Sequence, residues 1–264
     1  MKAGVSTACL YPKLLEESLY DLAVNGIDHV EIFVNTDSEL KKSYVSGLAQ
    51  TLKQFEVTCR SLHPYSCPIE PMMFFSVYER RVADALEYYK KYFQAMNILG
   101  ADIFVFHGNK NIMKISGERY CERFSKLVEL GKEFGVTVAQ ENVSRCTSGS
   151  LSFMREMVNL MGTDAKFVLD TKQAIRAGEK SLNIVRVLKE HIVHVHISDS
   201  GEMGDCLQIG RGRFNVKQFL SMLYKESPQC SVMLELYRSN FDGISDLVNN
   251  FHTLEKMISS VSAE

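Results

Sequence analysis

The sequence contains few prolines and no cysteine pattern typical of secreted or zinc-binding proteins. Five prolines are spread over 264 residues, and no proline-rich or glycine-rich linker divides the chain. The seven cysteines are an odd number and include no Cys-x-x-Cys pair. This spacing argues against a disulfide framework, and it indicates reduced thiols in a cytoplasmic protein.

Long hydrophobic runs and an excess of charge of one sign are also missing. No apolar run approaches the roughly 18 to 20 residues that cross a bilayer. The short apolar stretch near the N-terminus is broken by Pro12 and followed by acidic residues, which makes it a poor signal peptide. The 30 basic and 32 acidic side chains leave a net charge of −2. We therefore expect neither a nucleic-acid partner nor a membrane partner.

Two kinds of segment alternate along the whole chain. Amphipathic helical segments, such as 78–100 with its apolar stripe ending at Gly100, separate short apolar segments rich in β-branched residues. No Gly-x-Gly-x-x-Gly follows the first apolar segment, which argues against a Rossmann sheet. We predict a single (β/α)8 TIM barrel domain over residues 1–264, with strands at 4–8, 29–33, 57–62, 103–107, 136–142, 166–170, 193–197 and 232–236.

Ionisable residues stand at the carboxyl ends of seven of these segments, where (β/α)8 barrels place their chemistry. Taken alone, each is more often a helix cap, a salt-bridge partner or a hydrogen-bonded core residue; Glu31, for example, can pair with Arg60 on the neighbouring strand. Independent accidents would not favour one end of every strand, so the set indicates a functional site. Its members are Glu31, His63, His107, Glu141, Asp170, His196 and Glu235.

Three carboxylates and one imidazole within this set suit one divalent cation, such as Mn²⁺, Mg²⁺, Co²⁺ or Zn²⁺. Three negative charges at one barrel mouth also need a cation for compensation. Of the two histidines on the seventh strand, His194 and His196, we expect only His196 to face the barrel because it lies nearer the carboxyl end. The predicted ligands are therefore Glu141, Asp170, His196 and Glu235.

These residues lie in motifs that resemble the xylose isomerase-like barrels, a family of sugar isomerases and epimerases related to endonuclease IV. The resemblance covers essentially the whole chain and is carried by QEN (140–142), FVLD (167–170), HVHISDS (194–200) and LELY (234–237). SLHPY (61–65) and FHGN (106–109) are similar to the histidine strand ends of the endonuclease branch. The resemblance implies that one metal is bound by the four predicted ligands. It also implies that Glu141 and Glu235 move a proton between adjacent substrate carbons through an enediolate.

The chain departs from the family pattern in two loops. Gln173 stands where many members have histidine, and Cys206, Gln208 and Arg211 stand where histidine, proline and glutamate are common. These changes weaken the multinuclear zinc site of the endonuclease branch and leave the single-metal set intact. We expect Cys206 to be a plain thiol rather than a zinc ligand. His63, His107, Gln173 and Arg211 are predicted to orient the substrate.

The predicted function is a metal-dependent isomerase or epimerase acting on a small sugar, in a chain that can form a homo-oligomer. Lys172, Arg211 and Arg213 suggest a sugar phosphate or sugar acid, unless the arginines pair with nearby acidic residues. The apolar segment 64–76, with Phe74 and Phe75, is either a lid over the sugar or a subunit contact. An apurinic-site endonuclease and a non-catalytic sugar-binding barrel remain the alternatives.

Overall fold

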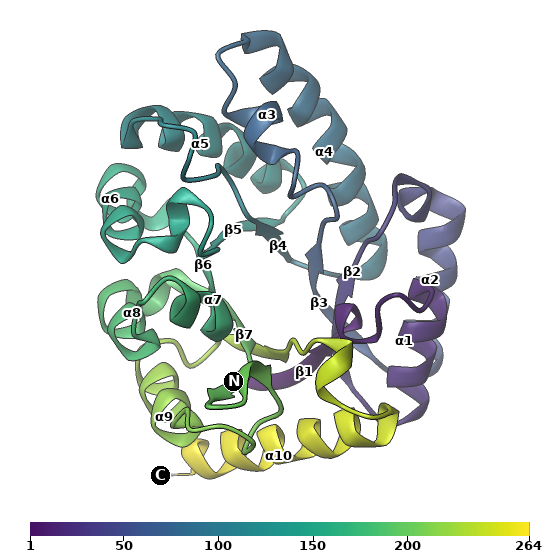
Figure 1. Ribbon diagram of the computed structural model, residues 1–264. Helices are drawn as coiled ribbons and strands as arrows, with labels where there is room; N and C mark the ends of the chain where they lie inside the picture. The colour runs from purple at the N-terminus through teal and green to yellow at the C-terminus, as the bar shows by residue number, and fades with distance from the viewer. Residues whose placement is uncertain (264) are drawn as a thin grey trace.

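Eight parallel strands close into a barrel in the computed structural model, which describes residues 1–263 (Figure 1). Their order is β1-β10-β7-β6-β5-β4-β3-β2, and β2 pairs with β1 to complete the ring. The predicted (β/α)8 barrel is therefore confirmed. The strands are β1 (Lys2–Ser6), β2 (His29–Phe33), β3 (Thr58–His63), β4 (Ile103–Phe106), β5 (Thr137–Glu141), β6 (Phe167–Asp170), β7 (Ile192–Ile197) and β10 (Ser231–Leu234).

Eight longer helices form the outer ring around these strands (Figure 1). They are α1 (Leu15–Val24), α2 (Lys42–Gln54), α4 (Glu79–Leu99), α5 (Gly117–Glu133), α6 (Leu151–Met161), α8 (Ser181–Leu188), α9 (Val216–Glu226) and α10 (Ile244–Ser262). Within residues 1–263, none of the helices combines the length and the apolar character that a bilayer crossing requires.

Several short elements lie in the loops and were not predicted. Two are the helices α3 (Glu70–Phe74) and α7 (Thr171–Arg176), and a third is the antiparallel pair β8 (Asp199–Gly201) and β9 (Gly204–Leu207). Single 3-10 turns occur at Thr7–Leu10, Asp37–Leu40, Thr147–Gly149, Gly162–Asp164, Lys189–His191 and Arg238–Asn240.

The amphipathic pattern explains how the helices attach to the barrel. In α4, Tyr89, Tyr92 and Phe93 are fully buried and pack against Phe104 of β4. Gly100 then ends the helix with a φ of 75°, a left-handed conformation that glycine adopts without steric cost. Burial of each such aromatic side chain contributes on the order of 2 kcal/mol, so the helix is held by its packed face.

The interior of the barrel is apolar in its middle layer and polar above it. Ile103, Val105, Ala139 and Val168 form a small buried cluster of their own. Side chains on a strand point to the same face at every second residue. The inward positions that follow Val105, Ala139 and Val168 are therefore 107, 141 and 170. The change from apolar to ionisable side chains at those positions places the polar layer at the carboxyl ends of the strands.

The expectation that the segment 64–76 forms an apolar lid or a subunit contact is wrong for Phe74 and Phe75, whereas Tyr65, Cys67 and Pro68 of the same segment line the cavity at the mouth. Phe74 is 0% exposed and packs against Tyr89 and Phe106, while Phe75 stacks on Tyr120 with ring centroids 4.4 Å apart. The two rings are part of the core because α3 turns them towards the aromatic residues of α4, β4 and α5.

Candidate metal centre

The QEN motif of β5 directs one glutamate into the barrel and uses the two amides beside it to hold the strand ends. The Gln140 amide donates to the carbonyl oxygens of Phe106 and His107. Asn142 and the backbone of Asp170 exchange two hydrogen bonds, of 3.0 and 2.6 Å. These amides fix β5 against β4 and β6, so Glu141 lies at a defined position between them.

The structure brings the four predicted ligands together. Glu141, Asp170 and His196 offer ligand atoms that lie within 4.8 Å of one another. Nδ1 of His196 is 3.4 Å from Oε1 of Glu141 and 3.8 Å from Oε2 of Glu235. Burial opposes charge on both glutamates, but His107 and His196 hold the pKa of Glu141 well below its usual value, and Lys172 and His196 lower the pKa of Glu235.

Lys172 lies among the four predicted ligands. We call Glu141, Asp170, Glu235 and Lys172 the outer cluster and count His196 with the inner cluster described below. Its Nζ lies 2.8 Å from Oε2 of Glu235 and 3.3 Å from Oδ2 of Asp170. Burial alone would lower the pKa of Lys172, but the two carboxylates raise it well above its usual value. Burial and the neighbouring glutamates raise the pKa of Asp170 to about 7 although Lys172 opposes the shift. The sequence placed Lys172 near the mouth but gave no sign of these contacts.

A second network lies below the outer cluster, and we call Glu31, Ser61, His194 and His196 the inner cluster. Oε2 of Glu31 is 2.8 Å from Oγ of Ser61 and 3.1 Å from Nε2 of each histidine. Burial opposes ionisation of Glu31, but His196 and His194 outweigh it and hold the pKa of this carboxyl well below its usual value. The same carboxylate raises the pKa of His196, whereas burial lowers that of His194.

Two expectations about this region are wrong. Glu31 does not pair with Arg60, because the register places Ser61 beside Glu31 and leaves Arg60 to pair with Asp102 at 2.8 Å. His194 also faces the barrel interior, because residues two apart on a strand share a face.

His63 and His107 approach Glu141 from the other side. Nε2 of His107 is 2.6 Å from Oε2 of Glu141 and 3.0 Å from Nε2 of His63. Nδ1 of His63 lies 3.2 Å from the carbonyl oxygen of Pro64, which can only accept, so the proton belongs on Nδ1 and the lone pair of Nε2 faces the site. Burial and His107 lower the pKa of His63 to about 4. The three residues form a second group of possible ligands.

The side chains of the remaining predicted residues have other partners or are exposed. Oε1 of Gln173 accepts hydrogen bonds from the backbone nitrogen and the hydroxyl of Ser144. Arg211 is exposed in the loop after β9. Arg213 is 2.7 Å from Glu202, as the surface-pairing alternative has it. Cys206 is buried, its thiol donates to the carbonyl oxygen of Glu235, and burial raises its pKa to about 11, in keeping with a plain thiol.

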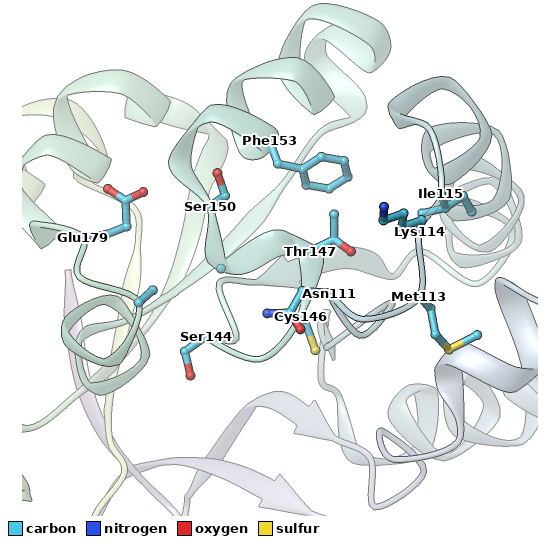
Figure 2. Close-up of a pocket in the computed structure, with 12 residues that line it drawn as sticks. Asn111, Met113, Lys114, Ile115, Ser144, Cys146, Thr147, Ser150, Phe153 and Glu179 are labelled. Atoms are coloured by element: carbon cyan, nitrogen blue, oxygen red, sulfur yellow. The ribbon is translucent and has the colours of Figure 1, made fainter.

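A cavity of about 450 Å³ opens over the outer cluster, and Lys172 and Glu235 line it together with Phe33, Tyr65 and Tyr237. Its volume suits a small sugar. A larger cavity of about 670 Å³ lies between the segment around Asn111–Ile115 and the segment 144–153, and it is lined by Phe153, Cys146 and Glu179 but by none of the predicted site residues (Figure 2).

The donor set fits a divalent cation. Oδ2 of Asp170 is buried and has no hydrogen-bond partner among residues 1–263, and Asp170, Glu141 and His196 offer ligand atoms within 4.8 Å of one another, with Oε1 of Glu141 the oxygen nearest Nδ1 of His196. Carboxylate oxygens with one imidazole nitrogen are typical ligands of Mn²⁺, Co²⁺ and Zn²⁺. Glu31 contacts Nε2 of His196, which leaves Nδ1 for the ion, in the manner of carboxylate–histidine–metal triads.

Comparison with known proteins gives the same architecture. A D-tagatose 3-epimerase-like protein superposes with a TM-score of 0.80 at 20% identity, covering 100% of this chain and 99% of its own. An IOLI protein with a zinc atom gives 0.76 at 19% identity, covering 99% and 98%. D-psicose 3-epimerase from Clostridium cellulolyticum H10, with D-tagatose, gives 0.75 at 17% identity, covering 99% of each chain.

An uncharacterized protein of Mycobacterium leprae is 27% identical over 240 residues, 80% of each chain. The family model described as the xylose isomerase-like TIM barrel matches residues 19–257, which is most of the sequence and includes all four predicted metal ligands. The chain therefore belongs to the xylose isomerase-like TIM barrel family.

Proposed function

We propose that this protein is a divalent-metal-dependent isomerase or epimerase of a small sugar. The observation that carries the proposal is the placement of two glutamates, Glu141 and Glu235, 3.4 and 3.8 Å from Nδ1 of His196, with Glu235 lining a sugar-sized cavity. The names of two structural relatives, D-tagatose 3-epimerase-like protein and D-psicose 3-epimerase, support the substrate class.

Each of the two glutamates can act as the base of this reaction. Neighbouring cations keep the pKa of both carboxyls below the usual value, so each is an acceptor for a proton near neutral pH. In an isomerisation, one carboxylate takes the proton from the carbon next to the substrate carbonyl and the resulting carboxylic acid gives it to the adjacent carbon, while the hydroxyl proton moves to the former carbonyl oxygen. In an epimerisation, the second glutamate first takes a proton from solvent and gives it to the same carbon from the opposite face, and the first glutamate releases the abstracted proton to solvent. The cation, when bound, acts as a Lewis acid that stabilises the enediolate charge.

The other groups of the site position the reactants. Asp170 accepts a hydrogen bond from the backbone nitrogen of Gln173 through Oδ1, which fixes the direction of Oδ2. Tyr65, Tyr237 and Phe33 surround the cavity with aromatic rings, which limit the access of water to a bound sugar. In this scheme His63 and His107 contact substrate oxygens beside Glu141.

Solvent-proton exchange tests the proposal. The Mn²⁺- or Co²⁺-loaded protein is incubated in D2O with a panel of neutral and phosphorylated ketoses, and incorporation of deuterium at carbon is followed by NMR. We expect exchange with at least one ketose and a loss of about 10³-fold or more in Glu235→Gln.

Glu255→Gln provides the control, because Glu255 is a half-exposed glutamate of the outer helix α10 that contacts His252 and does not line the mouth cavity. It should exchange at the wild-type rate. Absence of exchange with every ketose would overturn the proposal, as would equal exchange in wild type and Glu235→Gln. Cleavage of an abasic duplex, assayed in parallel, would favour the endonuclease alternative.

A further inference from the structure

We propose that Lys172 is a resident cation of the metal centre, and that a divalent ion reaches all four predicted ligands only after its ammonium group has moved. The inference rests on the ligand set of the proposed function, but it does not depend on the reaction. It assigns a role to a buried lysine for which the mechanism above has no use.

The ammonium group occupies the same oxygens that a metal ion would need. Oδ1 of Asp170 is engaged by the backbone nitrogen of Gln173, so Oδ2 is the oxygen left for a cation, and it lies 3.3 Å from Nζ of Lys172. Oε2 of Glu235 is the oxygen near Nδ1 of His196, and it lies 2.8 Å from the same Nζ. The ammonium therefore bridges two of the four predicted ligands.

Lys172 is held in this position by its location at the start of α7. Asp170 caps that helix, so a residue two positions later has its side chain directed back over the barrel mouth. The side chain of Lys172 is only 6% exposed, which makes it part of the interior and not a solvated surface lysine. A buried ammonium without carboxylate partners would be costly, and Asp170 and Glu235 provide those partners.

The mouth cavity also gives the ammonium group room to move, although Arg176 already lies 5.6 Å from the ring of Tyr237 that borders it. Nζ of Lys172 is 5.1 Å from the ring centroid of Tyr237, and Lys172, Glu235 and Tyr237 line the same cavity. A shift towards this ring retains a cation–π contact while Asp170 is released. Because like charges repel strongly in a partly desolvated site, we expect the lysine to weaken binding of a divalent ion.

Metal affinity tests the proposal without an activity assay. Metal-free wild type, Lys172→Met and Lys172→Arg are titrated with Co²⁺ by calorimetry, and the visible absorption of bound Co²⁺ reports its coordination. We expect Lys172→Met to bind Co²⁺ at least about tenfold more tightly than wild type, and Lys172→Arg to bind no more tightly. Without metal, Lys172→Met should melt at a lower temperature.

Lys132→Met is the matched control, since Lys132 also contacts two carboxylates, Glu129 and Asp164, but on the surface. It should bind Co²⁺ as wild type does. Equal or weaker binding in Lys172→Met, or no binding in either protein, would overturn the proposal.

If Lys172→Met does not fold, a crystal structure of the Co²⁺-loaded wild type decides. Nζ displaced from Asp170 supports the inference, and Nζ still bridging Asp170 and Glu235 overturns it. Proton exchange is measured separately, so failure of the proposed reaction would be distinguishable.

Discussion

The inner and outer clusters are both built around buried carboxylates but differ in how their charges are paired. In the inner cluster, Ser61 and two histidines converge on Oε2 of Glu31, and its side chain and both histidines are 0% exposed. Oε1 of Glu31 has no hydrogen-bond partner among residues 1–263, but the histidines on Oε2 balance the charge. In the outer cluster, several carboxylates lie close together, and Glu235 is 15% exposed and lines the cavity. A carboxylate enclosed by histidines supports the structure, whereas carboxylates that border a cavity can bind a ligand.

His196 connects the two clusters through its two ring nitrogens. Nε2 contacts Glu31 of the inner cluster, and Nδ1 faces Glu141 and Glu235 of the outer cluster. A change in the inner cluster should therefore alter both stability and metal binding, whereas a change confined to the outer cluster should act on binding and catalysis.

Glu31→Gln should have the largest effect, because it should change both stability and metal affinity. The substitution removes the charge that faces two buried histidines, so we expect the free energy of unfolding in urea to fall by about 3 kcal/mol. It also replaces the carboxylate that orients His196 by a neutral amide, a weaker acceptor with one oxygen only, so affinity for Co²⁺ should fall by about 10- to 100-fold.

Glu39→Gln provides the comparison for Glu31→Gln, because Glu39 is a largely buried glutamate outside the barrel interior that accepts a hydrogen bond from the backbone of Asn35. It should leave Co²⁺ binding unchanged. Unaltered Co²⁺ affinity in Glu31→Gln would show that the inner cluster does not support the metal centre.

The alternation of segments in the sequence was sufficient to predict the barrel and to predict that the site lies at the carboxyl ends of its strands. Val105, Ala139 and Val168 face inward, and the period of two then places His107, Glu141 and Asp170 in the next layer. The partners within that layer were not predictable. The position of Ser61 beside Glu31 follows from a register shift between Val30 and Glu31, and the reach of Lys172 follows from the angle of α7. Both depend on tertiary geometry that leaves no local pattern in the sequence.

Glu70 sharpens the comparison, because it is a fully buried carboxyl to which no basic side chain of residues 1–263 is hydrogen-bonded. It accepts hydrogen bonds from the backbone nitrogens of His107 and Gly108 and from the hydroxyl of Tyr89. Burial outweighs these contacts and raises the pKa of Glu70 from 4.5 to about 7. The folded state thus binds a proton that the unfolded state releases between these values, so stability should fall as the pH rises from about 4.5 to about 7.

Between these pH values, ionisation of Glu70 should lower the free energy of unfolding by about 3 kcal/mol, since each pKa unit corresponds to about 1.4 kcal/mol. Urea denaturation of wild type and Glu70→Gln at pH 5 and pH 8 measures it. The variant should show a smaller loss of stability at pH 8 than wild type does, because its amide does not ionise. The same pH dependence in both proteins would mean that Glu70 titrates normally and that its burial is compensated.

Ser231→Ala should have the smallest effect, and it separates the support of His194 from that of His196. Oγ of Ser231 lies 2.6 Å from Nδ1 of His194, on the side of that ring away from Glu31. Loss of one buried hydrogen bond should lower the free energy of unfolding by about 1 kcal/mol. Co²⁺ affinity should not change, because the contact of Glu31 with Nε2 of His196 remains. If Ser231→Ala weakened Co²⁺ binding as much as Glu31→Gln does, His194 would have to belong to the metal centre, and the division into two clusters would be wrong.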